Sequence, residues 1–165
     1  MARAGSKAFP VPEHDHAACI GDAMAMAEDL CRENGLRFTR LRRQVFELVW
    51  TSHAPLGAYD LLAMLNERGQ RAAPMTIYRA LDFLMAHGLV HRLNSRNAYI
   101  GCNHPGDGHA GQFLICRDCG RVAEIEERRI AEAVRDGASR AGFDVRLPVI
   151  EIEGQCFDCR GARHG

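Results

Sequence analysis

Two cysteine brackets of the same form, CRDC at residues 116–119 and CFDC at residues 156–159, constrain the fold of this chain more than any other feature. Two C-x-x-C pairs supply the four thiolates of a closed tetrahedral zinc site, here from Cys116, Cys119, Cys156 and Cys159. The 36 residues between the pairs exceed the interval of a compact zinc ribbon. We therefore expect a structural zinc that joins the two ends of a small folded domain and is required for its folding.

A competing interpretation is a pair of redox-active dithiols, or disulfides. A thioredoxin-type site uses one C-x-x-C pair at the start of a helix, whereas this chain has two pairs and Gly120 directly follows the first. Structural zinc is therefore the favoured interpretation.

The sequence shows neither a signal peptide nor a membrane span. Residues 1–10 hold no apolar core of signal-peptide length, and no apolar run approaches the roughly 20 residues of a membrane span. We expect a cytoplasmic protein without a membrane partner, in which thiols stay reduced and clustered cysteines bind metal.

The charge of the chain is distributed unevenly along the sequence, although the net charge is zero. Residues 36–96 carry nine arginines against four acidic residues, and residues 97–165 carry nine arginines against eleven. A basic first half joined to a mildly acidic second half suits a nucleic-acid-binding module followed by another domain. Arginines scattered over solvated helix faces would give the same composition. The order of structural elements therefore has to distinguish this alternative from a nucleic-acid-binding module.

That order is helical in the first half. A helix is predicted over 20–34, a second after the N-cap residue Thr39, a third over 58–68, and a fourth that begins near Pro74 and ends before Gly88. Two short alternating runs follow at 89–93 and 98–100, around a polar turn. Helices followed by a basic hairpin describe a winged helix-turn-helix, whose last helix enters the major groove of DNA.

The fourth helix is the predicted recognition helix. Its apolar stripe leaves Thr76 and Arg79 on the outward side with Tyr78 at the flank, so Arg79 is the candidate for a base or phosphate contact. Arg96, in the turn of the hairpin, is expected to contact the DNA backbone. An ordinary exposed arginine is the plainer interpretation of Arg79 taken alone. Helical periodicity also places Phe83 near the polar side and does not explain it.

The second half is predicted to be a small α/β dimerisation domain. We expect strands at 112–115 and 121–125, a helix over 127–141, and a longer strand over 143–152. The helix is expected to bury four apolar residues, namely Ile130, Ala133, Val134 and Ala138. The last strand would place Phe143, Val145 and Leu147 on one face. Apolar strands in so small a domain favour a homodimer, although a monomer that buries them under its own helix is the alternative.

Three segments of the sequence resemble the ferric uptake regulator family. MTIYRALDFL at 75–84 is similar to its recognition-helix signature, and FLICRDCG at 113–120 to its zinc bracket. AYDLL at 58–62 and the recognition helix look like the zinc uptake regulator branch, whose members are dimeric zinc-dependent repressors of zinc-acquisition genes. The resemblance implies that Tyr59 and Arg79 contact operator bases.

The same resemblance implies a second, regulatory zinc site with four ligands, namely His91, Cys102, His109 and Glu124. Taken singly, each residue has a plainer structural explanation. His104 is a possible substitute for His109, and His14 and His16 are more typical of a tail than of a site. The histidine-rich run of iron and peroxide sensors is absent at 108–111, and a thiolate ligand favours zinc over iron.

The expected fold is therefore α+β, with a tail at 1–19, a winged-helix DNA-binding domain at 20–101, a hinge at 102–111 and a dimerisation domain at 112–165. The resemblance implies a transcriptional repressor that binds operator DNA as a homodimer when it carries two zinc ions per chain. A regulator of the same family that senses iron, manganese or peroxide is the alternative. We expect no enzyme and no small-molecule substrate, because Cys102 with His104 or His109 is the only nucleophile and base that the sequence suggests.

Overall fold

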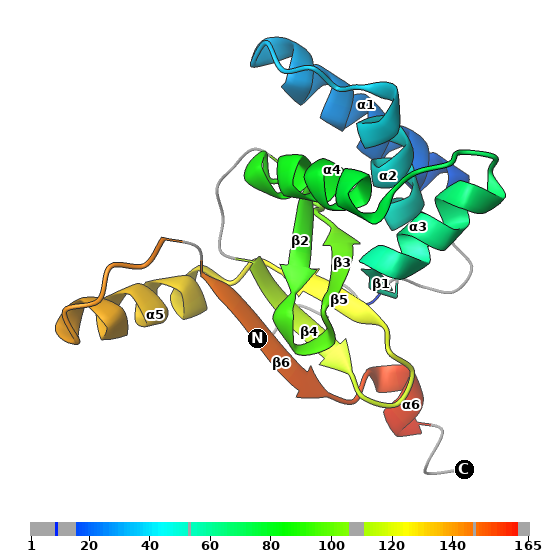
Figure 1. Cartoon of the computed structure of the whole chain (residues 1–165). Helices are drawn as coiled ribbons and strands as arrows, with labels where there is room; N and C mark the ends of the chain where they lie inside the picture. Colours follow the sequence, from blue (N-terminus) through cyan, green and yellow to red (C-terminus); the bar gives the residue numbers. More distant parts are fainter. Residues whose placement is uncertain (1–8, 10–15, 53, 106–110, 147, 162–165) are drawn as a thin grey trace. The chain divides into compact units, whose positions relative to one another are not determined.

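The computed structural model describes residues 9, 16–52, 54–105, 111–146 and 148–161. It divides into two compact units, one within residues 11–108 and one from residue 109 onward (Figure 1). Helix and strand both contribute to the fold, as the α+β prediction requires. Among the described residues, no helix combines the length and the apolar character needed to cross a membrane.

The first unit consists of four helices and a small sheet. The helices are α1 (His16–Glu33), α2 (Arg40–Trp50), α3 (Ala58–Glu67) and α4 (Pro74–Ala86). The strands are β1 (Leu56–Gly57), β2 (Val90–Leu93) and β3 (Ala98–Gly101), arranged in the order β1-β3-β2 with antiparallel pairing. Figure 1 shows the hairpin of β2 and β3 projecting from the helices, which is the arrangement of a winged helix-turn-helix.

Local sequence signals explain where these helices begin and end. The Thr39 hydroxyl accepts a hydrogen bond from the Arg42 N–H at 3.4 Å and caps α2, while Asp60 accepts one from the Gly57 N–H at 3.0 Å and caps α3. Gly88 ends α4 with a φ of +65°, which an L-residue rarely adopts. The Leu89 N–H then reaches back to the Leu84 carbonyl at 2.9 Å, and the chain enters the wing.

One continuous apolar core holds the helices together. Its fully buried members come from the predicted apolar faces of three helices, including Val45 and Leu48 on α2, Leu61 and Leu65 on α3, and Ile77, Leu81 and Leu84 on α4. The first helix contributes Ala23, Ala27 and Cys31. This core fixes which face of α4 points outward, because the buried stripe of α4 is held against α2 and α3.

Two details of the first unit differ from the predictions, and the predicted polar turn of the wing is found with a defined backbone form. Helix α1 begins at His16, four residues before its predicted start and inside the predicted tail. Strand β1 was not predicted, because its two residues become a strand only by pairing with Tyr99 and Ala98. The turn of the wing is a short 3-10 helix, Asn94–Arg96, closed by Asn97 in the left-handed conformation with a φ of 47°.

Gly101, at the end of β3, packs directly under the indole of Trp50. A Cβ at this position would lie 2.5 Å from Trp50 Nε1 and 2.7 Å from Cζ2, which is far inside van der Waals contact. Gly101→Ala should therefore destabilise the first unit by about 1–3 kcal/mol, because a rigid ring must move to admit the methyl group. Thermal or urea unfolding of the variant measures this loss.

The matched control for that substitution is Gly21→Ala. Gly21 lies in α1, and a Cβ added there meets nothing within 4 Å. Removing a glycine from the interior of an exposed helix should raise stability by up to about 1 kcal/mol. If both variants unfold at the same denaturant concentration, the contact between Trp50 and Gly101 does not limit the packing of the first unit.

The second unit is built on a mixed three-stranded sheet. Its strands are β4 (Gly111–Cys116), β5 (Val122–Ile125) and β6 (Val149–Gly154), in the order β5-β4-β6. β4 is antiparallel to β5 and parallel to β6. Helix α5 (Arg128–Arg140) connects β5 to β6, and the short helix α6 (Phe157–Gly161) follows β6.

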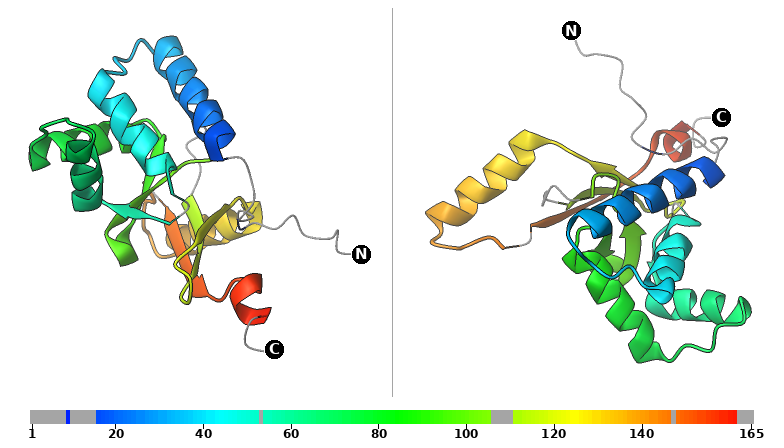
Figure 2. Two further views of the ribbon diagram at one scale, coloured as in Figure 1. Left: turned by 90° about the vertical axis from the view of Figure 1, so that its right-hand side faces the viewer. Right: turned by 90° about the horizontal axis from the view of Figure 1, so that it is seen from above.

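A buried glutamine fixes the start of α5. Gln112 is 2% exposed, its Nε2 donates to the Glu127 carbonyl at 3.0 Å, and its Oε1 accepts from the Glu127 N–H at 3.3 Å. Both ends of the side-chain amide are thereby satisfied, as burial of a polar group requires. Figure 2 shows α5 extending away from the sheet of its own unit.

Two predictions for the second unit are wrong. α5 contains no buried residue, and Val134 is 38% exposed, because the helix extends away from the sheet instead of packing on it. The strand predicted over 143–152 begins only at Val149, which pairs with Gly111. Phe143 and Val145 precede the strand, Phe143 is 68% exposed, and Leu147 lies outside the described residues.

Candidate metal centre and nucleic-acid-binding surface

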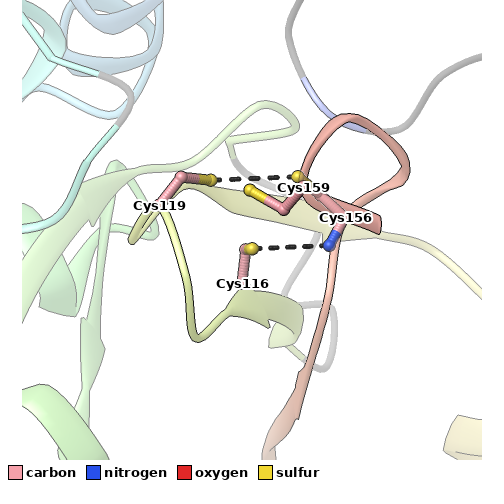
Figure 3. Close-up of side chains that lie close together, drawn as sticks. All are labelled: Cys116, Cys119, Cys156 and Cys159. Carbon is pink, nitrogen blue, oxygen red and sulfur yellow. Dashed lines mark hydrogen bonds between the residues drawn. The ribbon is translucent and has the colours of Figure 1, made fainter. Parts of the chain in front are cut away.

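The four bracket cysteines come together at one end of the second unit (Figure 3). Cys116 is the last residue of β4, and Cys119 lies in the turn before β5. Cys156 directly precedes α6, and Cys159 lies within it. The parallel pairing of β4 with β6 sets Cys116 opposite Gly154, and the Arg117 N–H bonds the Gly154 carbonyl at 2.9 Å. The sheet thus brings together two brackets that are far apart in the sequence.

The spacing of the sulfur atoms fits a tetrahedral zinc ion. All four Sγ atoms lie within 4.8 Å of one another, and the distance from Cys119 Sγ to Cys156 Sγ is 3.8 Å. Zn–S bonds of about 2.3 Å in a tetrahedron place neighbouring sulfurs about 3.8 Å apart. Cys116 and Cys156 are buried, Cys159 is half-buried and Cys119 is exposed, so four thiols, two of them withdrawn from solvent, supply the full ligand set of a structural zinc site.

Hydrogen bonds around the centre shape the pKa values of its thiols. Burial acts to raise the pKa of Cys116, but the backbone N–H groups of both brackets outweigh it and lower this pKa to about 6. The side chain of Arg121 lowers the pKa of Cys119, and the pKa of Arg121 is raised by the same hydrogen bond. Hydrogen bonds to Cys156 and then Cys119 raise the pKa of Cys159 to about 12. These contacts favour the thiolate form of Cys116 and Cys119 and the thiol form of Cys159, which must give up its proton when a metal binds.

The residues predicted for the second metal site are distributed over both units. His91 lies on β2 and Cys102 directly follows β3, and their ligand atoms lie within 4.8 Å of each other inside the first unit. The Cys102 N–H donates to the Leu89 carbonyl at 3.0 Å, which extends the hairpin by one bond and fixes the buried thiol beside His91. Glu124 is half-buried on β5 of the second unit.

Four other histidines bear on the metal sites that the sequence suggests. His109 lies outside the described residues, as does His14. His104 is exposed in the chain that follows Cys102. His16 is the first residue of α1, so it belongs to a helix and not to a tail.

The residues predicted to meet DNA lie on the surface of the first unit. Arg79 is exposed on α4, where Thr76 and Tyr78 are half-buried beside it. Tyr59, in the first turn of α3, is 69% exposed, which is unusual for so large an aromatic ring. Arg96 is exposed in the turn of the wing. All five side chains are therefore placed on elements that a winged helix-turn-helix presents to the duplex.

The structure explains Phe83, which helical periodicity could not. The guanidinium carbon of Arg42, on α2, lies 3.5 Å from the centroid of the Phe83 ring, and the His87 ring lies 4.5 Å from it. Arg42 also donates to the carbonyl of Arg37. The Phe83 ring thus holds the Arg42 guanidinium of α2 against α4 by a cation–π contact, one turn beyond Arg79. No pattern within either helix indicates this pair, because it depends on how α2 packs against α4.

Comparison with known proteins agrees with these features. The model of the ferric uptake regulator family matches residues 33–152. A zinc uptake regulation protein of Escherichia coli strain K12 is 36% identical over 139 residues, covering 84% of this chain and 81% of the relative. A zinc uptake regulation protein of Mycobacterium tuberculosis strain CDC 1551 is 31% identical over 129 residues, covering 76% of this chain and 96% of the relative.

A solved structure of a zinc uptake regulator complexed with zinc and DNA is also similar. It has a TM-score of 0.83 and 34% sequence identity, and the match covers 88% of this chain and 98% of that chain. Sequence and fold therefore lead to the same assignment over most of the chain. This chain belongs to the ferric uptake regulator family.

Proposed function

We propose that this protein is a zinc-responsive transcriptional repressor, which binds operator DNA as a homodimer when loaded with zinc and controls zinc-uptake genes. The observation that carries the proposal is that one chain contains both a four-cysteine centre and a winged helix-turn-helix. Similarity to zinc uptake regulation proteins over more than three quarters of the chain supports zinc as the signal. Regulation of transcription, not catalysis, is the function of the family to which the chain belongs.

The regulatory zinc site is assigned to His91, Cys102, His109 and Glu124, which gives two zinc ions per chain. The proximity of the His91 and Cys102 ligand atoms supports this assignment. His109 and Glu124 are included because the sequence resembles zinc regulators at these positions. A thiolate with two imidazoles and a carboxylate is a zinc-type donor set, whereas iron and manganese sensors prefer harder oxygen ligands. Cys102 therefore favours zinc over the alternative of an iron, manganese or peroxide sensor.

The homodimer is assigned to the second unit, residues 112–165. In the sheet that the described residues form, β6 pairs only with β4 and is therefore an edge strand. Val149 and Ile152 on β6, Val134 on α5 and Phe143 before the strand are all more than a third exposed in the single chain. An edge strand and an apolar helix face that lack cover within one chain favour a two-fold partner.

Residues 20–101 then form the DNA-binding domain and 102–111 the hinge. Tyr59, Thr76, Tyr78 and Arg79 are the proposed contacts in the major groove, and Arg96 is the proposed contact of the wing with the backbone. The remaining partners are double-stranded operator DNA and a second copy of the chain, in the cytoplasm, where the bracket thiols stay reduced. Neither a membrane nor a small-molecule substrate is part of the proposal.

Arg79→Ala tests the assignment of α4. If Arg79 makes a bidentate contact to a base, its loss should weaken operator binding by about 1–3 kcal/mol, which is roughly 5–150-fold in Kd. Fluorescence anisotropy with zinc-loaded protein on operator and on scrambled DNA measures this, with Arg32→Ala as the control. Arg32 is also an exposed arginine of the first unit, but it lies in α1 and pairs with Asp29 at 2.7 Å.

The two DNAs separate the possible results. A loss on operator that exceeds the loss on scrambled DNA identifies Arg79 as a base-reading residue, whereas an equal loss on both reduces it to a phosphate contact. The wild-type protein tests the function itself in the same experiment. If its operator affinity is the same with and without added zinc, the protein is not a zinc-responsive repressor.

A further inference from the structure

The two cysteine brackets of the four-cysteine centre are linked by more than their thiols. Each bracket has an aspartate at its third position, Asp118 in the first and Asp158 in the second. Asp158 Oδ2 accepts a hydrogen bond from Arg121 Nη2 at 2.6 Å, and Asp118 Oδ2 accepts one from Gln155 Nε2 at 2.6 Å. Each aspartate therefore bonds a residue that flanks the opposite bracket, and two reciprocal bonds tie the brackets together.

Arg121 also contacts one sulfur atom of each bracket. Its Nε lies 3.4 Å from Cys119 Sγ, and its Nη2 lies 3.4 Å from Cys156 Sγ. The side chain is 22% exposed, so the guanidinium is largely withdrawn from water beside the thiols. Because a guanidinium presents several N–H donors in a fixed planar fork, one side chain can hold two sulfurs and a carboxylate at once.

A nearby arginine has none of these contacts. Arg117 lies inside the first bracket, but its side chain is 71% exposed and pairs with Glu153 at 3.7 Å. The two arginines are four residues apart and carry the same charge. They differ in their surroundings, because Arg121 is largely buried against two sulfurs and Asp158, whereas Arg117 is exposed.

The charge of the loaded centre explains what Arg121 contributes. A zinc ion with four thiolates carries two excess negative charges, and burying that charge is costly unless it is paired or hydrogen-bonded. A guanidinium in contact with two of the sulfurs offsets part of it at short range and low dielectric. N–H···S bonds also draw electron density from the sulfurs, which makes thiolates less nucleophilic. Partners of this kind outside the ligand set change metal affinity about 10–100-fold when they are removed.

We infer that Arg121 is a positioning residue of the four-cysteine centre, which holds Cys119 and Cys156 in place and thereby slows both zinc release and chemical modification of these two ligands. The inference rests on zinc at this centre and is independent of the regulatory site and of repression. Asp158 orients the guanidinium, and the bond between Asp118 and Gln155 is the second link between the brackets.

Zinc transfer to an excess of the chromophoric chelator 4-(2-pyridylazo)resorcinol tests the inference on the full-length, zinc-loaded protein. The slow phase, which belongs to the four-cysteine centre, should be about 10–100-fold faster in Arg121→Ala than in wild type. Arg117→Ala should release zinc within about twofold of wild type, because it removes an equal charge without touching a sulfur. Equal release rates for Arg121→Ala and wild type, or for the two alanine variants, overturn the inference.

Alkylation with iodoacetamide supplies the second measurement. Mass spectrometry of the digested protein should show faster modification of Cys119 and Cys156 in Arg121→Ala, with Cys116 less affected because no contact to Arg121 holds it. A uniform increase at all four cysteines would indicate general unfolding and would contradict a specific role. If Arg121→Ala does not fold, Arg121→Lys replaces it, and it should show intermediate zinc release because an ammonium keeps the charge and loses the fork. Release at the wild-type rate in Arg121→Lys overturns the inference.

The zinc content of wild-type protein separates this inference from the proposed function. If wild type carries no zinc that resists mild chelation, the four-cysteine centre is not a zinc site, and both fail. If wild type carries such a zinc but does not respond to zinc in DNA binding, only the proposed function fails, and the chelator experiment still decides the role of Arg121.

Discussion

Cys156→Ser should release the zinc of the four-cysteine centre, unfold the second unit and abolish the dimer. The buried Cys156 is one of the four proposed zinc ligands, and its N–H also donates to Cys116 Sγ at 3.4 Å. Structural zinc contributes an apparent 10–16 kcal/mol, roughly, to the folding of small domains, whereas whole domains are stable by only about 5–15 kcal/mol. The stabilising free energy lost with the metal therefore exceeds the folding free energy that the sheet alone can supply.

Three measurements on the same sample check this expectation. Mass spectrometry for metals should show one zinc fewer per chain, circular dichroism should show reduced strand content, and light scattering should show monomers. Cys19→Ser is the control, because Cys19 is a half-buried cysteine of α1 outside the cluster. A Cys156→Ser protein that remains dimeric with unchanged zinc content would show that the brackets do not hold the metal that folds this unit.

Cys102→Ser should abolish the response to zinc while leaving the fold and the structural zinc intact. Serine is a much poorer zinc ligand than a thiolate, and Cys102 is the thiolate of the proposed regulatory site. A zinc ion whose ligands come from both halves of the sequence binds only conformations that bring those ligands together, so it selects one of them. Coupling free energies of this kind are typically about 1–3 kcal/mol, and zinc should accordingly tighten operator binding of wild type by about 5–150-fold and that of the variant hardly at all.

The effect of operator DNA on zinc affinity provides the second measurement. Operator DNA should tighten zinc binding at the regulatory site of wild type by the same factor, because linkage between two ligands is symmetric. Cys31→Ser, which replaces a buried cysteine of α1 away from the site, controls for the loss of a buried thiol. If Cys102→Ser still binds operator tightly only when zinc is supplied, the sensing site lies elsewhere. His109→Ala and His104→Ala, compared in the same assay, then show which histidine takes part.

Much of the first unit could be predicted because its helices follow rules that act within each segment. Thr39, Pro74 and Gly88 mark helix ends by local chemistry, and the apolar stripe of α4 predicts both its core face and the exposure of Arg79. β1 was missed because two residues carry no periodicity. It becomes a strand only when Tyr99 arrives opposite Leu56.

The second unit was harder to predict because its boundaries depend on partners distant in the sequence. Apolar alternation runs from Phe143 to Leu147 and is interrupted at Pro148, but the strand itself begins only at Val149, where it pairs with Gly111 of β4. The cysteine brackets were visible because zinc demands both a residue type and a spacing. Arg121 was not visible, because it lies outside the bracket and gains its role only when β6 brings Asp158 and Cys156 beside it.

The parallel pairing of β4 with β6 also sets an order of events during synthesis. The elements of the first unit all lie within residues 11–108, and that unit can fold as soon as those residues have left the ribosome. The sheet of the second unit and its metal centre can form only after residues 149–159 have been made, because these residues supply β6 and the second cysteine bracket. Pairing between strands so far apart in the sequence is also slow. A newly made chain in a zinc-starved cell would therefore carry a folded first unit attached to an unfolded, metal-free second unit, and unfolded chains are the general targets of cellular chaperones and proteases.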